Sequence, residues 1–267
     1  MKTTTVTEED KVECRKIQVR LLDSLKSVCE KHNLVFWIDF GTLLGAHMHK
    51  GFIPWDDDID ISMPMKDYKK FLTIAEKELP KDIFLQTPKT DRNYKQCFAK
   101  LCDRNSTFLH ENETGEELYH QGIYMDIFPS VVYPKMPYLL RKVLLYFTVR
   151  SRANAVISRK NILLNYSIYI FCKFIWLLFS PFKVDKVAQT VEDNGYYYAI
   201  PQSYIYPLVD LEFEGKLYPA PNKVHEYLSL MYGKYTPTPP METRISRAKT
   251  ILFNTPCKYQ KALNKNE

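Results

Sequence analysis

The chain has 267 residues, a net charge of +6 and a hydrophobic content of 45%. These values fit one substantial folded domain with an added segment, and they exclude a disordered chain. The six cysteines form no Cys-x-x-Cys pair, and the first ten residues contain no secretory segment. We therefore expect reduced thiols in a cytosolic protein, with neither a disulfide framework nor a zinc site.

An amphipathic helix is predicted over residues 8–31, because Thr7 can cap it and apolar residues recur at helical spacing. Residues 35–40 are rich in aromatic and β-branched side chains, which predicts a strand. A small-residue turn with Gly41 and Thr42 follows, and then a short helix. Gly41 allows a ligand to approach the backbone, Thr42 offers a hydroxyl, and a helix start suits an anion such as a phosphate.

The most informative stretch is the acidic run that follows Gly51 and ends in Asp56-Asp57-Asp58-Ile59-Asp60. Asp58 and Asp60 alternate with isoleucines, so a strand would place them on one face, about 7 Å apart at the backbone. Carboxylates this close repel each other unless a cation lies between them. Hard oxygen ligands suit Mg²⁺ in phosphoryl chemistry. The alternative is a solvated turn, since aspartate is a common turn residue.

A helix over residues 66–79, ended by Pro80, and short strands near residues 83–85, 98–101, 108–110 and 123–128 complete the first half of the chain. Asp126 lies between apolar neighbours on the last of these strands. A buried charge there is costly unless it is paired or bound to a metal. Asp126 is thus either a third metal ligand that also accepts a proton, or the partner of a buried lysine or arginine.

Three further residues are candidates for substrate contacts. Lys100, on a predicted strand, is the cation that we expect near phosphate groups, and Arg104 is a second candidate. A strand lysine is otherwise a solvated edge charge. His49 precedes the acidic run and either orients a substrate or is a structural histidine.

Residues 131–190 have the most unusual composition, with ten basic residues and one acidic residue, whereas the remainder has 27 basic and 30 acidic residues. Within this insert, residues 162–179 are very apolar but are interrupted by Asn165, Ser167 and Lys173. A spanning helix needs about 20 apolar residues. We interpret the segment as an interfacial element beside anionic headgroups, with an ordinary buried helix as the alternative. Nucleic acid is not an expected partner, because the cations accompany apolar runs.

The sequence resembles the LicD family, a branch of the nucleotidyltransferase-fold superfamily that includes phosphocholine transferases and fukutin-type ribitol-phosphate transferases. The resemblance covers most of the chain from about residue 15 to 240. The matching motifs are Gly41-Thr42-Leu43-Leu44-Gly45, residues 49–60, Lys100-Leu101, Asn105-Ser106-Thr107, residues 125–129, Tyr227-Leu228, residues 232–235 and Pro239-Pro240.

This resemblance implies an α+β fold in which a mixed sheet is flanked by helices. The composition of residues 131–190, which match the family poorly, adds a basic, apolar helical insert to this fold. The expected parts are a catalytic core over 1–130, the insert over 131–190 and a C-terminal part over 191–267 that completes the LicD domain. It further implies that Asp58, Asp60 and Asp126 are catalytic and hold Mg²⁺ or Mn²⁺, while the substrate contacts Gly41, Thr42, His49, Asp56 and Lys100.

The implied reaction moves an alcohol phosphate, such as phosphocholine, from a CDP-activated donor to a glycan acceptor, which can be lipid-linked. The enzyme is then cytoplasmic and peripheral on an anionic membrane surface. Two departures concern the substrate. Met48 replaces the usual arginine, so that a phosphate-facing cation is missing there or Lys50 serves instead, and Lys234 replaces the usual acid of the Tyr-Gly-x-Tyr element. Two rivals remain open, namely a nucleotide-sugar glycosyltransferase with an Asp-x-Asp pair and a non-catalytic glycan- or membrane-binding module.

Overall fold

A computed structural model of the chain describes residues 6–189, 199–237 and 248–265. The helices and strands in chain order are α1 (Glu8–His32), β1 (Trp37–Ile38), α2 (Phe40–His49), β2 (Asp60–Pro64), α3 (Met65–Glu78), β3 (Ile83–Gln86), β4 (Ala99–Asp103), β5 (Thr107–His110), β6 (Tyr124–Pro134), α4 (Tyr138–Arg152), η1 (Ala153–Ile157), α5 (Ile162–Phe179), β7 (Lys183–Gln189), β8 (Ile200–Pro201), α7 (Gln202–Ile205), β9 (Val209–Phe213), β10 (Lys216–Ala220), α8 (Val224–Tyr232), β11 (Ala248–Leu252) and α9 (Lys258–Leu263).

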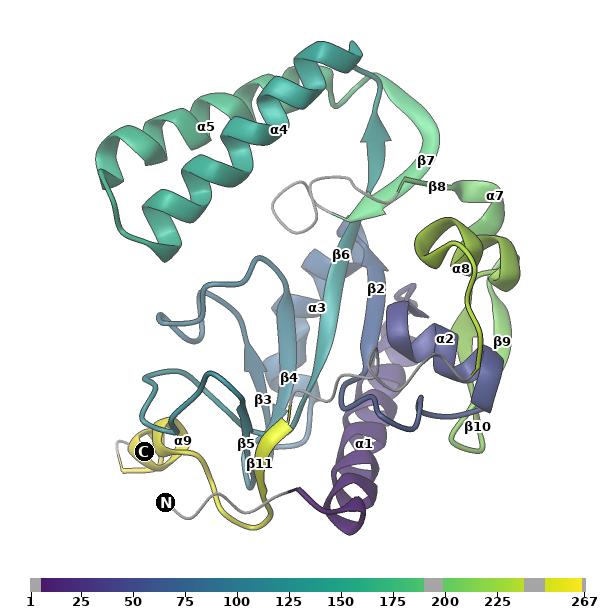
Figure 1. Cartoon of the computed structure of the whole chain (residues 1–267), viewed down its shortest axis with the longest axis vertical. Coiled ribbons are helices and arrows are strands. Elements are labelled where there is room, and N and C mark those ends of the chain that lie inside the picture. Colours follow the sequence, from purple (N-terminus) through teal and green to yellow (C-terminus); the bar gives the residue numbers. More distant parts are fainter. Residues whose placement is uncertain (1–5, 190–198, 238–247, 266–267) are drawn as a thin grey trace.

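A seven-stranded mixed sheet forms the centre of the molecule (Figure 1). Five strands follow the order β1-β2-β6-β4-β3, while β7 pairs with the far half of β6 and β8 pairs with β7. Strands β2 and β6 are parallel, and the other neighbours are antiparallel. The expected mixed sheet flanked by helices is therefore confirmed.

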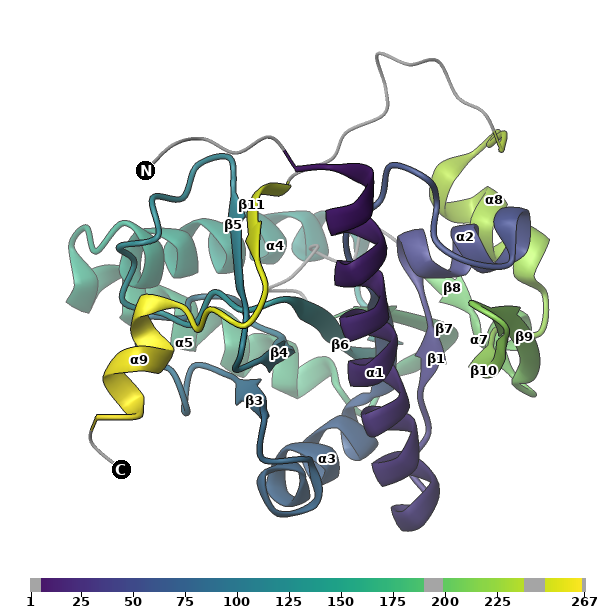
Figure 2. The same ribbon diagram turned by 90° about the horizontal axis from the view of Figure 1, so that it is seen from below.

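Helices α1 and α3 pack beside each other on one face of this sheet (Figure 2). Helix α1 begins where the sequence predicts, because Thr7 and Asp10 form a reciprocal capping box. Its residues Leu21, Leu22 and Leu25 are fully buried in the main core, together with Ile59 and Ile61 beside the acidic run. The apolar stripe of α1 thus supports the strand that follows the aspartates.

The C-terminal third of the chain packs against the beginning of the fold. Helix α8 and the β9–β10 hairpin contact α2, and β11 pairs with β5. The expected division at residue 130 falls inside β6, so the insert begins and ends as strands of the central sheet, and only its α4–η1–α5 part is helical. The other expected division, at residue 190, lies outside the described residues. All six cysteines are free.

The strand expected over 35–40 is shorter than predicted, and there is no separate turn after it. Strand β1 covers only Trp37–Ile38, and α2 begins at Phe40. The cause is Asp39, whose carboxylate accepts the backbone N–H of Phe40 and caps the helix. Gly41 and Thr42 are consequently part of the first turn of α2.

Candidate active site

Two aspartates on neighbouring strands and a third in the loop before one of them converge beside the sheet. One carboxylate oxygen from each of Asp58, Asp60 and Asp126 lies within 4.8 Å of the others. Asp60 begins β2 and is the register partner of Asp126 on β6, so the parallel pairing fixes two of the three. Asp58 lies in the loop just before β2 rather than on the strand that we expected. The same loop forms a second group of carboxylates, Asp56, Asp57 and Asp58.

Helix α1 holds this loop in place. The Arg15 Nη2 atom donates to the backbone carbonyls of Ile53, Pro54 and Asp56 at 3.1, 2.8 and 3.2 Å. The buried Gln18 amide donates to the carbonyl of Asp57 at 2.7 Å. These bonds go to backbone carbonyl oxygens. They hold the loop in place without engaging the aspartate carboxylates.

The cluster is electrostatically strained. Burial first, and then the nearby Asp56 and Asp126 carboxylates, raise the pKa of Asp58 well above its usual range. Burial, Asp58 and Asp126 do the same to the pKa of Asp60. Burial and Asp57 raise the pKa of Asp56 to about 6. Three converging hard oxygen donors that resist ionisation without a cation fit Mg²⁺ or Mn²⁺.

Lys100 lies at the border of this cluster. It is the cross-strand partner of Asp126 in the β4–β6 pairing, and its Nζ atom is 2.8 Å from Asp126 Oδ1. The same Nζ atom lies 3.4 Å from the centroid of the Tyr124 ring. Asp126 therefore makes both of the contacts considered from the sequence, because it pairs with the half-buried Lys100 and also lies beside the other carboxylates. The single positive charge of Lys100 does not neutralise three carboxylates, so the cluster would still attract a further cation.

The start of α2 faces the same cluster. Gly41 and Asp56 line the acidic cavity, and a Cβ atom added at Gly41 would lie 2.5 Å from Asp56 Oδ2. Thr42 is placed differently, since its buried hydroxyl accepts the backbone N–H of Asp60 at 2.8 Å. Gly41 thus allows the Asp56 carboxylate to lie close to the start of α2, and its contact with a ligand stays a prediction, whereas Thr42 positions the strand that carries Asp60.

The buried carboxylate of Asp39 was not predicted as part of the site. Beyond capping α2, it accepts hydrogen bonds from Ser62 Oγ at 2.6 Å and from the Tyr227 hydroxyl at 2.8 Å. It therefore ties β2 and α8 to the helix start that lines the cavity. An aspartate at the N-cap position, one residue before Gly41-Thr42, is the sequence signal for this role.

The acidic cavity has a volume of about 460 Å³. Besides the aspartates and Gly41, its walls contain side chains that sequence reasoning missed, namely Phe40, Phe98, Phe128, Gln189 and Tyr232. Phe128 makes edge contacts with Phe40 and lies 4.5 Å, centroid to centroid, from Phe98. A charged floor beneath aromatic walls is typical of a site for an ionic group that carries an organic part.

Other predicted contacts lie elsewhere. His49 ends α2, eight residues and about 12 Å along the helix from Gly41. Lys50 caps the same helix end and pairs with Glu212 at 3.1 Å, so it does not replace the arginine missing at Met48. Arg104 donates to Gln260. None of these residues lines the acidic cavity in the described part of the chain; Lys234 is exposed, and Pro239 and Pro240 lie outside the described residues.

Fold and site together define a class of protein. Asp60 and Asp126 lie opposite each other on the parallel strands β2 and β6, and Asp58 joins them from the loop before β2. Consistently, residues 33–146 match the family model described as LicD/FKTN/FKRP, nucleotidyltransferase domain. Residues 33–146, which contain the three converging aspartates, are therefore similar to the nucleotidyltransferase domain of the LicD family, in agreement with the motifs.

Similar proteins agree with this assignment. The chain is 29% identical over 247 residues to the lipopolysaccharide cholinephosphotransferase LicD of Haemophilus influenzae, a match that covers 84% of this chain and 90% of that protein. An uncharacterised protein of Rickettsia typhi is 42% identical over 55 residues, which is 21% of this chain and 18% of that protein. An uncharacterised protein of Rickettsia prowazekii is 44% identical over 48 residues, 18% of each chain.

Proposed function

We propose that the protein transfers an alcohol phosphate, phosphocholine or a similar group, from a CDP-activated donor to a glycan hydroxyl during the synthesis of cell-surface polysaccharide or lipopolysaccharide. The observation that carries the proposal is the convergence of Asp58, Asp60 and Asp126 within 4.8 Å. The similarity to the H. influenzae enzyme, which extends over most of both chains, supports the choice of donor and acceptor.

Asp58, Asp60 and Asp126 are the residues that would hold the metal. Bound Mg²⁺ or Mn²⁺ would neutralise charge on the donor diphosphate and on the departing phosphate. Gly41 keeps the start of α2 open beside this group. Lys100 adds a fixed positive charge at the border of the site, where phosphate oxygens carry negative charge.

The transfer is a displacement at phosphorus. The acceptor oxygen forms a bond to the phosphorus that carries the alcohol, the bond from that phosphorus to the CMP oxygen breaks, and CMP leaves with the electron pair. The acceptor hydroxyl loses its proton to the Asp126 carboxylate. Positioning and charge stabilisation supply most of the acceleration in such reactions.

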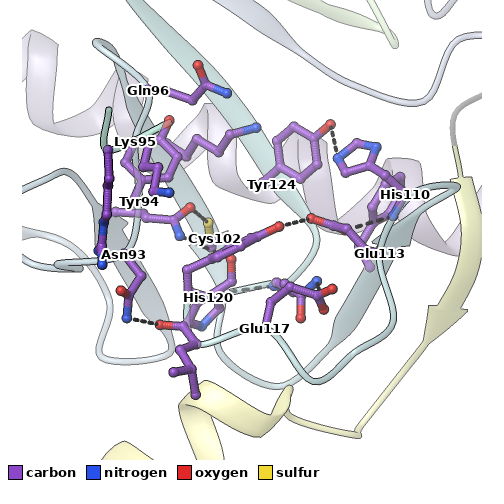
Figure 3. A pocket seen from close by; sticks show the side chains of 18 residues that line it. Asn93, Tyr94, Lys95, Gln96, Cys102, His110, Glu113, Glu117, His120 and Tyr124 are labelled. Atoms are coloured by element: carbon purple, nitrogen blue, oxygen red, sulfur yellow. Dashed lines mark hydrogen bonds between the residues drawn. The ribbon is translucent and has the colours of Figure 1, made fainter. Parts of the chain in front are cut away.

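Figure 3 shows a second cavity, of about 540 Å³. Lys100 lines it and pairs with Asp126, which lines the acidic cavity. Aromatic, amide and acidic side chains line it. Across it the Tyr119 hydroxyl donates to Glu113 at 2.6 Å, and the Tyr124 hydroxyl lies 3.2 Å from His110 Nε2. Aromatic faces combined with several hydrogen-bonding groups are typical of sites for polar, carbon-rich ligands.

This second cavity is the place that we assign to the acceptor glycan. Tyr124 and Asp126 are two residues apart on β6, so they face the same side of the sheet. A hydroxyl that enters past Tyr124 therefore meets Asp126, while the donor occupies the acidic cavity on the other side of the Lys100–Asp126 pair. The two substrates would thus approach the proton acceptor from opposite sides.

Replacing Tyr119 with alanine is expected to raise the KM for the acceptor about 10-fold while the donor KM changes little, because one aromatic wall is lost. Tyr119→Phe, which keeps the ring but loses the bond to Glu113, is expected to stay closer to the parent protein. The measurement is initial rate against acceptor and donor concentration. Leu263→Ala, in a different cavity, is the control; an equal rise in the donor KM for Tyr119→Ala would contradict the assignment.

The proposed reaction is tested by the nucleotide that is released. Purified protein with Mg²⁺ and a glycan acceptor is expected to release CMP from at least one of CDP-choline, CDP-glycerol and CDP-ribitol, and a chelator is expected to stop the release. Release of UDP or GDP from a nucleotide sugar would favour the glycosyltransferase instead. No turnover with any activated donor would favour the non-catalytic binding module.

The proposal also concerns where the reaction occurs. A CDP-activated donor implies a cytoplasmic enzyme, and a lipid-linked acceptor implies contact with the inner face of the membrane. Among the described residues one helix, α5, is long and apolar enough to cross a membrane, and only 11% of it is buried. How this helix meets a membrane is a separate structural question.

A further inference from the structure

The helical part of the insert is a hairpin that crosses the end of the central sheet (Figure 1). Helices α4 and α5 pack on each other through a small core of Leu144, Cys172 and Trp176. The indole N–H of Trp176 donates to the Thr148 hydroxyl at 3.0 Å between the two helices. The hairpin is therefore a defined unit. Each of its two helices buries one face against the other helix and leaves its remaining surface uncovered by that contact.

The remaining surface of this hairpin is apolar and exposed. In α5, Leu163, Ile170, Phe174 and Leu177 recur at helical spacing along one face, with exposed fractions of 87, 49, 54 and 64%. The large exposed apolar side chains of the hairpin and its exit are Tyr138, Leu139, Val143, Tyr146, Phe147, Val149, Ile162, Leu163, Leu164, Tyr166, Ile170, Phe171, Phe174, Leu177, Leu178 and Phe182. Continuous apolar surface of this kind marks contact with a partner or a membrane.

Positive charge accompanies the apolar surface. Lys142, Arg150, Arg159 and Lys160 are exposed on or between the two helices, and Asp185 is the only acid between residues 131 and 190. Long basic side chains beside aromatic and aliphatic residues match the boundary between anionic headgroups and acyl chains. A protein partner would need a large acidic and apolar surface to match both features.

The topology decides how such a hairpin can lie in a membrane. Strand β6 leads into α4 and β7 leaves α5, and the two strands pair antiparallel, with Val132 opposite Val187 and Pro134 opposite Lys183. The chain therefore enters and leaves the hairpin on the same side, so α5 cannot cross a bilayer alone. Helix α4 cannot accompany it across, because its 15 residues include four basic residues, Arg141, Lys142, Arg150 and Arg152, which are costly in the hydrocarbon core.

From these observations we infer that the α4–η1–α5 hairpin inserts its apolar face into a single leaflet of a membrane that contains anionic lipid, and that it lies along the interface without crossing it. This inference does not depend on the identity of the donor or acceptor. The hairpin also touches the catalytic body, since Arg152 Nη2 donates to the Lys95 carbonyl at 2.6 Å and Arg159 lines the second cavity. Docking would thus bring that cavity to the lipid surface.

The test is flotation of the full chain with vesicles of phosphatidylcholine, with and without phosphatidylglycerol. Binding is expected only with the anionic vesicles, and it is expected to weaken between about 0.1 and 1 M salt, as the Debye length falls from about 10 to 3 Å. Replacing Leu163, Phe174 and Leu177 with serine is expected to weaken partitioning by about 10-fold or more. Replacing Lys142, Arg150 and Lys160 with glutamine is expected to abolish the preference for anionic lipid.

The matched control replaces Val12, Leu217 and Leu230 with serine, since these apolar residues are 49, 57 and 41% exposed outside the hairpin. It is expected to bind vesicles as the parent does, and all variants are expected to keep the parent melting temperature. A tryptophan placed at Phe174 should be quenched more by nitroxides near the headgroup than by nitroxides at the bilayer centre. Stronger quenching by the nitroxides at the bilayer centre would overturn the single-leaflet arrangement. Failure to bind vesicles, or lipid-independent dimers that the hairpin substitutions dissolve, would overturn membrane docking itself.

Discussion

Asp58→Asn and Asp60→Asn are each expected to reduce turnover by about 10²-fold or more, and at the same time to make the metal-free protein more stable. The loss of turnover follows because each change removes a charged oxygen ligand from a preformed site. The gain in stability follows because these carboxylates repel each other and Asp126 in the folded chain. Replacing a residue that supports the fold would instead make the metal-free protein less stable.

The sign of the stability change depends on how many protons the folded and unfolded chains bind. The folded-state pKa values of Asp58 and Asp60 are raised by burial and by neighbouring carboxylates, whereas the unfolded value for aspartate is about 3.9. The folded chain therefore binds more protons, and these two groups lower the free energy of unfolding as the pH rises from about 4 toward their raised pKa values. At neutral pH asparagine removes this penalty.

The measurement is thermal unfolding at neutral pH with a chelator and then with excess Mg²⁺, beside turnover at saturating donor. We expect the variants to melt about 2 °C or more above the parent without metal, and we expect Mg²⁺ to raise the melting temperature of the parent only. Asp185→Asn, at an exposed position, is the control. Near-parental turnover in both variants, or an unchanged Mg²⁺ response, would remove these residues from the metal site.

Most of the local structure could be predicted, because it depends on local sequence. Helices α1, α3 and α5 have caps, breakers or apolar spacing within their own residues, and their observed bounds differ by at most one residue from those expected. The beginning of α2 could not be predicted from the aromatic run before it. It depends on Asp39, whose carboxylate is held by Tyr227, 188 residues away.

The site was predictable in its residue types but not in its geometry. Two acids separated by one residue indicated a metal, yet Asp58 precedes the strand, and its place depends on Arg15 and Gln18 of α1. The contact of Lys100 with Asp126 required the register of β4 on β6. By contrast, sequence proximity to the acidic run was misleading for Lys50, which lies at the far end of α2.

The second cavity was not predicted, because most of its walls come from loops without periodicity between residues 93 and 122, which strands β3 to β6 and Arg159 complete. The density of aromatic residues there, with Tyr94, Tyr119 and Tyr124 close to an expected catalytic strand, was the available signal. Only the folding of these loops around β4 and β6 makes the residues neighbours. Binding sites are commonly formed in this way, by loops that a rigid sheet positions.

Asp126→Asn tests whether Asp126 accepts the proton of an acceptor that binds in the second cavity, while the donor binds in the acidic cavity. If Asp126 accepts the proton of the acceptor hydroxyl, kcat is expected to fall by about 10²-fold or more, while the KM values for donor and acceptor change little, because the lost interaction belongs to the transition state. Asparagine keeps a side-chain oxygen near Lys100 Nζ, which lies 2.8 Å from Asp126 Oδ1 in the parent protein, so the fold is expected to persist.

Lys100→Met is the matched comparison, because it removes the other member of the same ion pair. If Lys100 contacts the donor phosphates, this variant is expected to raise the donor KM, whereas Asp126→Asn is not. Both variants are measured by initial rates at varied donor, acceptor and Mg²⁺, with melting temperature as the folding control. A donor KM that rises together with the Mg²⁺ requirement in Asp126→Asn would make Asp126 chiefly a metal ligand, and full activity would remove it from the site. Equal kinetic effects in the two variants would mean that the ion pair acts as one unit, and the proton would then need another acceptor.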